Sequence, residues 1–475
     1  GGAGVIRPEV RAHFVGIGGA GMSAIAEVLL RRGYAVSGCD VRDGPAVARL
    51  RRLGAPVALG HSADHLAGSD LLVVSRAVAD ETEEIRAARA AGMPVRHRAE
   101  VLAEIMRGGR SIAVVGTHGK TTTTAMLARV LAAAGLDPTA LIGAYVPEFD
   151  SNALVGAGPW IVAEVDESDG SLLHVAPTGV VLTSLDVTDH RDFYASATQL
   201  GDTFGRFLRA AASDGFVVAC ADDPGARETA GAFGRLAVTY GFDPQAAVRG
   251  EVRALRGRCA QARVYLDGRP AAELALQVPG RHNVSNALGA IAAALQVGVP
   301  LSTAVDALAG FQGASRRFEV HGEVGGVMVV DDYAHNPVKV SAVLRAAREG
   351  WPQRRVIALF QPHRFSRTRT TFAQFARAFD AADEVVITEI YAADEPVQPG
   401  VSARLIVDAV AAHRRVHYRP TMEEAIALVE TLATPAAIVL TLGAGDVGRA
   451  ADLLLRRLGD RTPGAGSGAR VGGAP

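Results

Sequence analysis

Short apolar runs alternate with longer amphipathic segments along most of the chain, and a glycine-containing turn often separates them. Apolar runs occur at residues 13–17, 35–39, 111–115, 160–164, 179–183, 326–331, 355–360, 384–389 and 437–442. Such runs, joined by helical segments, are typical of buried parallel strands in α/β proteins. The pattern therefore predicts an α/β fold, with helices that include residues 22–32, 121–134 and 284–297.

A chain of 475 residues is too long for one hydrophobic core, so several domains are expected. The pattern divides into three blocks, which we place at residues 1–107, 108–313 and 314–461. The last residues, 462–475, are rich in Gly, Pro and Ala and have no apolar pattern, which predicts a disordered tail.

Composition narrows the class of protein. The 49 basic and 50 acidic residues give a net charge of -1, whereas nucleic-acid binders usually carry a basic excess. No apolar run reaches the roughly 18 residues that a membrane span needs. Cys39, Cys220 and Cys259 form neither a disulfide framework nor a zinc spacing, which suits a reducing cytoplasm. We expect a cytoplasmic protein that binds neither nucleic acid nor a membrane; a monomer and a homodimer both remain open.

The first glycine loop, residues 16–21, reads G-I-G-G-A-G and joins a predicted strand to a predicted helix. Asp40 follows at the end of the next strand. This spacing is typical of dinucleotide-binding loops, in which backbone amides hold a pyrophosphate and an acid binds a ribose. Because a UDP-sugar also carries a pyrophosphate, the loop fits either a nicotinamide or flavin cofactor or a sugar nucleotide.

The second glycine loop, residues 116–122, reads G-T-H-G-K-T-T and again joins a strand to a helix. It departs from the usual phosphate-binding motif because Val114 occupies the place of the first glycine. The chain has only two lysines, Lys120 and Lys339, so an ammonium is kept here against a strong preference for arginine. A compact ammonium fits a narrow amide cradle that a guanidinium does not. The loop therefore predicts ATP binding.

Acidic residues follow the predicted strand at residues 160–164, in the sequence E-V-D-E-S-D at residues 164–169. Carboxylates at the end of a parallel strand lie where ligands bind in open α/β sheets, and they suit Mg²⁺. A solvated acidic loop is the alternative.

Several longer motifs then occur in a fixed order. HFVGIGGAGMSAIAEVL is followed by GTHGKTTTT, DESD, GRHNVSNALGA, RRFEVHGE, DDYAHNP and QPHRFSRT. Over residues 11–460 the chain resembles the Mur ligase family. The resemblance implies a Rossmann-like UDP-sugar domain, a P-loop ATPase-like central domain and a Rossmann-like domain for the amino acid, in the order of the three blocks. It implies no nicotinamide cofactor.

The implied reaction is the ATP-dependent joining of L-alanine to the lactyl carboxylate of UDP-N-acetylmuramate, with Mg²⁺, through an acyl phosphate, in peptidoglycan precursor synthesis. A family member that attaches a preformed tripeptide to the same nucleotide sugar shares the N-terminal motif and is the nearest alternative. Outside the family, a dehydrogenase would explain the first loop but not Lys120, and a nucleotide-sensing ATPase would explain the second loop but not residues 361–367.

The resemblance also implies site residues. Those expected to bind the UDP-sugar are Gly18, Gly19, Ala20, Gly21, Met22, Asp40, His61 and Ser75. Those expected to bind ATP are Gly116, Thr117, His118, Gly119, Lys120, Thr121, Thr122, His282, Asn283 and Asn286. Those expected to hold the metal are Thr121, Glu167 and His190. Those expected to bind the amino acid are Tyr333, His335, His363 and Arg367.

Four of these positions are expected to be catalytic. The resemblance implies that Lys120 and Arg317 offset phosphate charge, the latter like an arginine finger, and that Arg367 pairs with the alanine carboxylate. His335 would deprotonate or orient the alanine ammonium. The chain departs from the family at Ser184 and Asp186, where Asn and Glu are usual. These differences weaken the detailed assignment of a second metal site, which the resemblance would otherwise imply.

Overall fold

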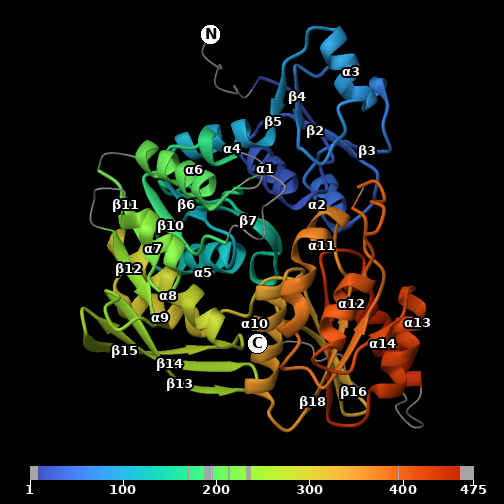
Figure 1. Cartoon of the computed structure of the whole chain (residues 1–475). Helices are drawn as coiled ribbons and strands as arrows, with labels where there is room; N and C mark the ends of the chain where they lie inside the picture. Colours follow the sequence, from blue (N-terminus) through green and yellow to red (C-terminus); the bar gives the residue numbers. More distant parts are fainter. Residues whose placement is uncertain are drawn as a thin grey trace. The chain divides into compact units, whose positions relative to one another are not determined.

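The computed structural model describes residues 9–167, 171–186, 194, 196–211, 214–231, 237–393 and 395–460. So far as they are described, residues 1–254, 260–277 and 282–315 form one compact unit, and residues 255–259, 278–281 and 316–475 form a second. Figure 1 shows the helices and strands of both. His190 and the predicted tail at residues 462–475 lie outside the described residues.

The first sheet has five parallel strands in the order β3-β2-β1-β4-β5. The strands are β1 (Ala12–Val15), β2 (Val36–Asp40), β3 (Val57–Leu59), β4 (Leu71–Val74) and β5 (Val95–His97). The helices are α1 (Ala20–Arg31), α2 (Pro45–Arg52), η1 (Ala63–Leu66), α3 (Glu83–Ala90) and α4 (Arg98–Arg107). Because strand residues alternate between faces, Phe14 packs with α1 while Val15 packs with η1 and α3.

The second sheet has ten strands in the order β15-β14-β13-β12-β11-β10-β6-β9-β7-β8. They are β6 (Arg110–Val115), β7 (Thr139–Val146), β8 (Ser151–Leu154), β9 (Trp160–Glu164), β10 (Gly179–Leu182), β11 (Phe216–Cys220), β12 (Val238–Gly241), β13 (Val248–Arg256), β14 (Cys259–Leu266) and β15 (Arg269–Leu276). The helices are α5 (Lys120–Ala133), η2 (Pro147–Phe149), η3 (Ser171–His174), α6 (Ala197–Ala210), α7 (Pro224–Gly231), α8 (Arg281–Gln296) and α9 (Leu301–Ala309).

The third sheet, in the second unit, has the order β16-β17-β21-β18-β19-β20. Its strands are β16 (Glu319–Val324), β17 (Val327–Asp332), β18 (Arg355–Phe360), β19 (Glu384–Ile387), β20 (His417–Tyr418) and β21 (Ala437–Leu442). Its helices are α10 (Pro337–Gly350), α11 (Phe365–Thr371), η5 (Phe372–Arg377), α12 (Arg404–Ala411), α13 (Met422–Leu432) and α14 (Gly448–Asp460).

The α/β class predicted from the pattern is confirmed, and each of the two larger sheets also contains antiparallel pairing. Antiparallel pairs include β7 with β8, β14 with β15, and β16 with β17. The β14–β15 hairpin turns at Asp267 and Gly268, whose φ angles are 46° and 78°. Asp-Gly in this left-handed conformation is typical of a two-residue hairpin. The Asp-Gly pair could have predicted this hairpin from the sequence. The strands on either side were not recognised because they are half exposed and lack a continuous apolar run.

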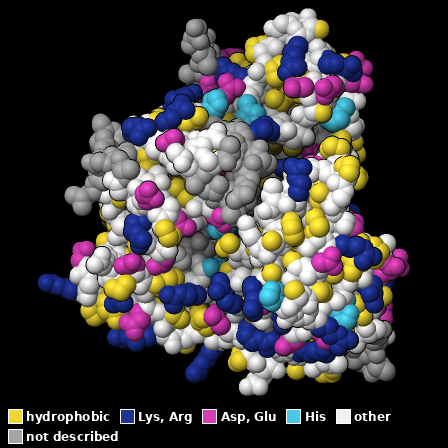
Figure 2. Space-filling model, in the orientation of Figure 1, with side chains coloured by type: hydrophobic (Ala, Val, Ile, Leu, Met, Phe, Trp, Pro, Cys, Tyr) yellow, Lys and Arg dark blue, Asp and Glu magenta, His cyan; other side chains and the backbone are white. Residues whose placement is uncertain are grey.

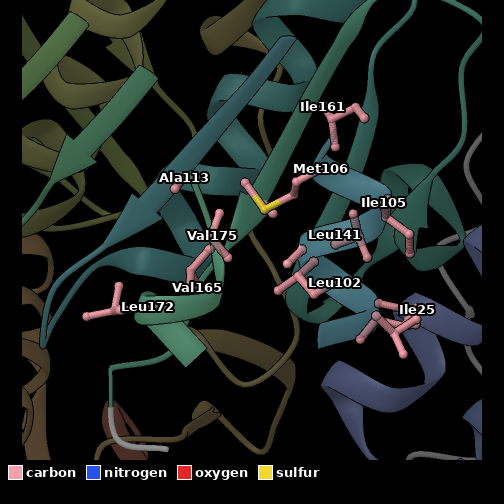
Figure 3. Packing of buried hydrophobic residues seen from close by; sticks show 14 of the residues in the cluster. Ile25, Leu102, Ile105, Met106, Ala113, Leu141, Ile161, Val165, Leu172 and Val175 are labelled. Atoms are coloured by element: carbon pink, nitrogen blue, oxygen red, sulfur yellow. The ribbon is translucent and has the colours of Figure 1, made fainter. Parts of the chain in front are cut away.

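One buried apolar cluster runs through the first two sheets. Figure 3 shows Ile25 from α1 beside Leu102 and Ile105 from α4, with Leu141 and Ile161 from the second sheet in the same cluster. The first unit therefore has a continuous core, which holds the helix after the first glycine loop against the second sheet.

A buried ion pair crosses the same boundary. The Glu27 carboxylate on α1 is fully buried and accepts from Arg49 Nε at 2.8 Å and from Ser151 Oγ at 2.7 Å. Asn152 Nδ2 donates to the carbonyl of Ala20 at 2.6 Å. A buried charge is stable only when it is paired and hydrogen-bonded. Helices α1 and α2 are thus tied to β8 through one carboxylate.

Within the described residues, no helix is long and apolar enough to cross a membrane.

We predict that Glu27→Ala destabilises the first unit by about 3–5 kcal/mol, because it leaves the Arg49 guanidinium buried without its anion. Arg31 is the control, since it bonds the same carboxylate but its side chain is 49% exposed. Arg31→Ala should cost under about 1 kcal/mol. Denaturant unfolding followed at Trp160, in a Trp351→Phe background, measures both. Equal losses for the two variants would show that the buried pair contributes little.

Candidate active site

The second glycine loop lies between β6 and α5, as the sequence predicts. Gly119 has φ +80°, and an added Cβ there would lie 2.4 Å from Asn286 Oδ1. Both the backbone conformation and the close approach of α8 therefore require glycine. Asn286 accepts from Thr123 Oγ1 at 3.4 Å and donates from Nδ2 to Asn283 Oδ1 at 3.2 Å. The fold thus brings Asn286 of α8 to the loop, with Asn283 hydrogen-bonded to it.

Lys120 occupies the centre of this site. Its Nζ donates to the carbonyl of Gly116 at 2.6 Å and to both carboxylate oxygens of Glu167 at 2.9 Å. Burial acts to lower the pKa of Lys120, but attraction to Glu167 and Asp166 outweighs it and raises the pKa above its usual value. Lys120 therefore remains an ammonium. With only two lysines in the chain, the basic side chains on the face in Figure 2 are almost entirely arginines.

Oxygen donors for a hard cation gather beside the lysine. Thr121 Oγ1 donates to Glu164 Oε1 at 3.1 Å, and Glu164 Oε2 accepts from the amide of Gly143 at 2.8 Å. Glu167 is fully buried next to them. Hydroxyl and carboxylate oxygens are the ligands that Mg²⁺ prefers, so this donor set fits the ion. Sequence reasoning selected Glu167 and named Glu164 only as part of an acidic segment.

The departures from the family, Ser184 and Asp186, lie against the glycine loop. Ser184 Oγ accepts from the amide of His118 at 2.9 Å, and the amide of Asp186 donates to Thr117 Oγ1 at 2.8 Å. His118 Nε2 lies 3.4 Å from Asp186 Oδ2. In the described structure these two residues support the loop. His190, the third predicted metal ligand, lies outside the described residues.

The first glycine loop is fixed by Asp40. The Asp40 carboxylate accepts from the amide of Gly18 at 2.8 Å and from the amide of Arg42 at 3.0 Å. His61 Nδ1 lies 3.1 Å from Glu84 Oε2. Ser75 directly follows β4. The ligand roles of these residues stay predictions, while the contact to Gly18 gives Asp40 a structural role as well.

Arg98 was missed by the sequence reasoning. An added Cβ at Gly21 would lie 2.3 Å from Arg98 Nη1, so the guanidinium rests against the first glycine loop. The same side chain lies 3.5 Å from Asp166 in the acidic segment. Arg98 begins α4 directly after β5, at the sheet edge where ligands bind in such folds. The position of Arg98 directly after a strand could have indicated a binding residue from the sequence alone.

The second unit brings the predicted amino-acid residues together after β17 and β18. His335 Nδ1 lies 2.8 Å from the carbonyl of Tyr333, and this carbonyl can only accept. The neutral imidazole of His335 therefore carries its lone pair on Nε2. The rings of His335 and His363 are 6.0 Å apart, and Arg367 Nη1 lies 3.1 Å from His363 Nδ1.

The surroundings of His363 determine its protonation state. Burial and then the charges of Arg367 and Arg364 lower the pKa of His363 to about 3. At neutral pH the ring is uncharged, so His363 Nδ1 accepts from Arg367. This neutral partner leaves the full positive charge of Arg367 for an anion.

Arg317 lies between two strained residues. Arg316 and Phe318 have φ angles of 59° and 50°, which side chains other than glycine rarely adopt. The guanidinium of Arg317 stacks 5.0 Å from the Tyr333 ring. Burial raises the pKa of Asp332 to about 6, and the charge of Arg317 opposes this rise.

Comparison with known proteins identifies three family segments. Residues 11–110 match the Mur ligase family, catalytic domain. Residues 114–294 match the Mur ligase middle domain. Residues 316–445 match the Mur ligase, glutamate ligase domain.

Whole relatives are similar over nearly their full length. UDP-N-acetylmuramate–L-alanine ligase of Solidesulfovibrio magneticus is 45% identical over 93% of this chain and 97% of its own. The Rubrobacter xylanophilus enzyme of the same name is 44% identical over 94% and 100%. The crystal structure of UDP-N-acetylmuramate-alanine ligase MurC from Thermotoga maritima has a TM-score of 0.82 at 31% identity, over 96% of this chain and 100% of that one. A murein peptide ligase from Psychrobacter arcticus shares the fold, with a TM-score of 0.70 at 24% identity, over 95% of this chain and 99% of that one.

We predict that Gly119→Ala weakens ATP binding at least about 10-fold, a loss of about 1.4 kcal/mol, because the methyl group strains the backbone and displaces Asn286. Gly135 is the matched control, since its φ is +74° but an added Cβ meets nothing within 4 Å. Gly135→Ala should keep ATP affinity. Calorimetry measures both, and similar affinities in the two variants would contradict the close contact with α8.

Proposed function

The chain belongs to the Mur ligase family, and we propose that it uses the residues described above to couple ATP cleavage to amide-bond formation. Its activity is the joining of L-alanine to UDP-N-acetylmuramate in peptidoglycan precursor synthesis. The observation that carries this assignment is full-length similarity to enzymes of that activity. The position of Lys120 among the acids that follow β9 supports the site assignment. We assign the UDP-sugar, ATP and amino acid to residues 1–107, 108–313 and 314–461.

The chemical problem is that a carboxylate is a poor electrophile. Transfer of the γ-phosphoryl group of ATP to the lactyl carboxylate gives an acyl phosphate with a good leaving group, and the alanine amine then displaces phosphate. We assign Lys120 and Arg317 to the charge that develops on the transferred group. Thr121, Glu164 and Glu167 would hold Mg²⁺, which when bound offsets negative charge on the phosphate oxygens.

The charges around Lys120 affect the form in which ATP binds. Lys120 lies close to three carboxylates, those of Glu164, Asp166 and Glu167, which leaves the site negative before the nucleotide arrives. A bare triphosphate would be repelled by such a set. We infer that ATP binds together with Mg²⁺, and that Glu167 would help to hold the cation, which would offset the negative charge of the phosphates.

The alanine site is assigned to the segments after β17 and β18. Arg367 would pair with the alanine carboxylate through its two-pronged guanidinium, supported by neutral His363. The lone pair on His335 Nε2 would accept a hydrogen bond from the alanine ammonium. His335 thus orients the amine or takes its proton, and both roles use the same tautomer.

We assign the UDP-sugar to the first glycine loop, where the amides of residues 18–22 would face the diphosphate. Arg98, which rests against Gly21, adds a cation at this position. Asp40, His61 and Ser75 are assigned to the ribose, uracil or sugar. Because the reaction consumes ATP, we propose the cytoplasm as its compartment.

The function is tested by phosphate release from ATP with UDP-N-acetylmuramate and a panel of amino acids, with mass spectrometry of the products. We expect release that depends on both UDP-N-acetylmuramate and L-alanine. A tripeptide used as well as alanine would instead indicate the activity of the family member that attaches a preformed tripeptide. Phosphate release that ignores the nucleotide sugar would indicate an ATPase without ligase activity.

We predict that Lys120→Arg lowers turnover more than about 10-fold, a loss above about 1.4 kcal/mol, because the guanidinium cannot enter the cradle formed with Gly116 and Glu167. Lys339→Arg is the control, since the cap contact of Lys339 is made by its backbone amide and survives the change. If Lys120→Arg kept more than about a tenth of the wild-type turnover, the cradle would accept a guanidinium.

We predict that Gly19→Val weakens UDP-N-acetylmuramate binding and leaves ATP binding nearly unchanged. The structure has room for a Cβ atom there, since an added Cβ meets its nearest atom at 3.4 Å and φ is −62°. The loss would then come from blocked approach of the diphosphate. Calorimetry with each nucleotide measures it, and equal losses for both would exclude separate sites.

We predict that Arg367→Ala raises the KM for L-alanine, glycine and L-serine together, because the carboxylate is common to all three. The wild-type preference for alanine over glycine should be only about 10- to 200-fold, the range that one methyl group supports. Competition among the three amino acids measures both. If Arg367→Ala no longer used L-alanine but still used L-serine, Arg367 would contact the side chain of the substrate and not its carboxylate.

A further inference from the structure

Five metal-ligating side chains gather on one face of the first sheet, next to the first glycine loop. His13 and Cys39 come from β1 and β2, His61 and His65 from the segment around η1, and Glu84 from α3. We propose that this cluster binds a transition-metal ion such as Zn²⁺. The inference does not depend on the proposed function.

The ligand atoms are spaced as a tetrahedral ion requires. Cys39 Sγ lies 3.9 Å from His61 Nδ1 and 3.2 Å from Glu84 Oε1, and His61 Nδ1 lies 3.3 Å from the same Glu84 oxygen. Bond lengths of about 2.0–2.3 Å to zinc place neighbouring tetrahedral ligands about 3.3–3.8 Å apart. These three side chains therefore form one face of a coordination tetrahedron with only small adjustment.

A second group of three ligands borders the first and shares Cys39 with it. Ligand atoms of Cys39, His13 and His65 also lie within 4.8 Å of one another. His65 Nδ1 lies 3.0 Å from Glu84 Oε1, so His65 borders the same carboxylate. The two groups share Cys39, which makes the thiol the centre of the cluster.

A buried nitrogen of His13 gives independent support. His13 is 2% exposed, and its Nδ1 bonds Ser37 Oγ at 2.9 Å. Its Nε2 is buried with no hydrogen-bond partner in the described structure. Leaving such an atom unsatisfied costs about 1–3 kcal/mol. An ion within reach of Nε2 would satisfy it, and the hydrogen bond from Nδ1 would orient the ring as outer partners of metal-bound histidines do.

The ligand types select the ion. A thiolate and imidazoles favour Zn²⁺ or Co²⁺ over the hard Mg²⁺ of the ATP site. Binding would release the Cys39 proton to solvent, since the thiolate is the ligand. The thiolate and the Glu84 carboxylate together carry two negative charges, which a divalent ion neutralises. The occupied site would therefore be electrically neutral, as burial requires.

An occupied site would fasten the segment around η1 to the sheet beside the first glycine loop. Cys39 precedes Asp40, whose carboxylate holds the amide of Gly18. His61 is also a candidate for the nucleotide sugar. The metal would thus fix residues that border the sugar-nucleotide site.

The test is Co²⁺ titration of the full chain after treatment with a chelator. We expect one equivalent to bind with a thiolate-to-cobalt absorption band, and Zn²⁺ to remove the band. Cys39→Ser should lose the band, while Cys220→Ser and Cys259→Ser, which change the only other cysteines, should keep it. Absence of the band in the wild-type chain would overturn the proposal, as would its loss only in Cys259→Ser.

Proton release gives a second readout that does not depend on the spectrum. Calorimetry of Zn²⁺ binding in buffers of different ionisation enthalpy should show about one proton released from the thiol in the wild-type chain and none in Cys39→Ser. Unfolding followed at Trp160 establishes that the variant is folded. Equal proton release in both proteins would mean that zinc binds elsewhere.

Discussion

The Lys120 ammonium is the group on which the arrangement of the active site depends, because a buried cation is stable only among anions. Its partners Glu164 and Glu167 stand at the end of β9 and just beyond it, and β9 pairs in parallel with β6. Strand β6 leads directly into the loop that carries Lys120. Parallel pairing of these two strands therefore brings the cation and the acids to one edge of the sheet, whichever ligand later binds there.

The two glycine loops are held in one unit by contacts that lie behind them. Asn152 of β8 reaches the backbone of Ala20 in the first loop, while Arg98 touches that loop and Asp166 of the acidic segment. The core around Ile25 continues into the second sheet. Phosphoryl transfer requires reactants held at a fixed separation, and we infer that this packing supplies it for the two nucleotides.

The sequence predicted the α/β class, the strand Trp160–Glu164 and both glycine loops, because these features depend on local periodicity and local turn chemistry. It missed Arg98 and the cluster around Glu84, because their contacts join residues far apart in the chain. The cysteines showed no zinc spacing for the same reason, because the other candidate metal ligands near Cys39 come from β1, η1 and α3. The β14–β15 hairpin was missed because its half-exposed strands have no continuous apolar run.

Backbone strain is concentrated beside Arg317. Left-handed conformations at Arg316 and Phe318 cost about 1–2 kcal/mol each, so surrounding bonds must hold them. Arg316 Nε donates to Asp331 at 2.8 Å, and the amide of Phe318 donates to Asp332 at 2.7 Å. Both acids end β17, so the sheet itself enforces the strained path. A backbone fixed in this way limits the directions open to the Arg317 side chain and lowers the entropy lost when it meets an anion. We infer that the strain is retained because it orients this arginine for the phosphoryl group.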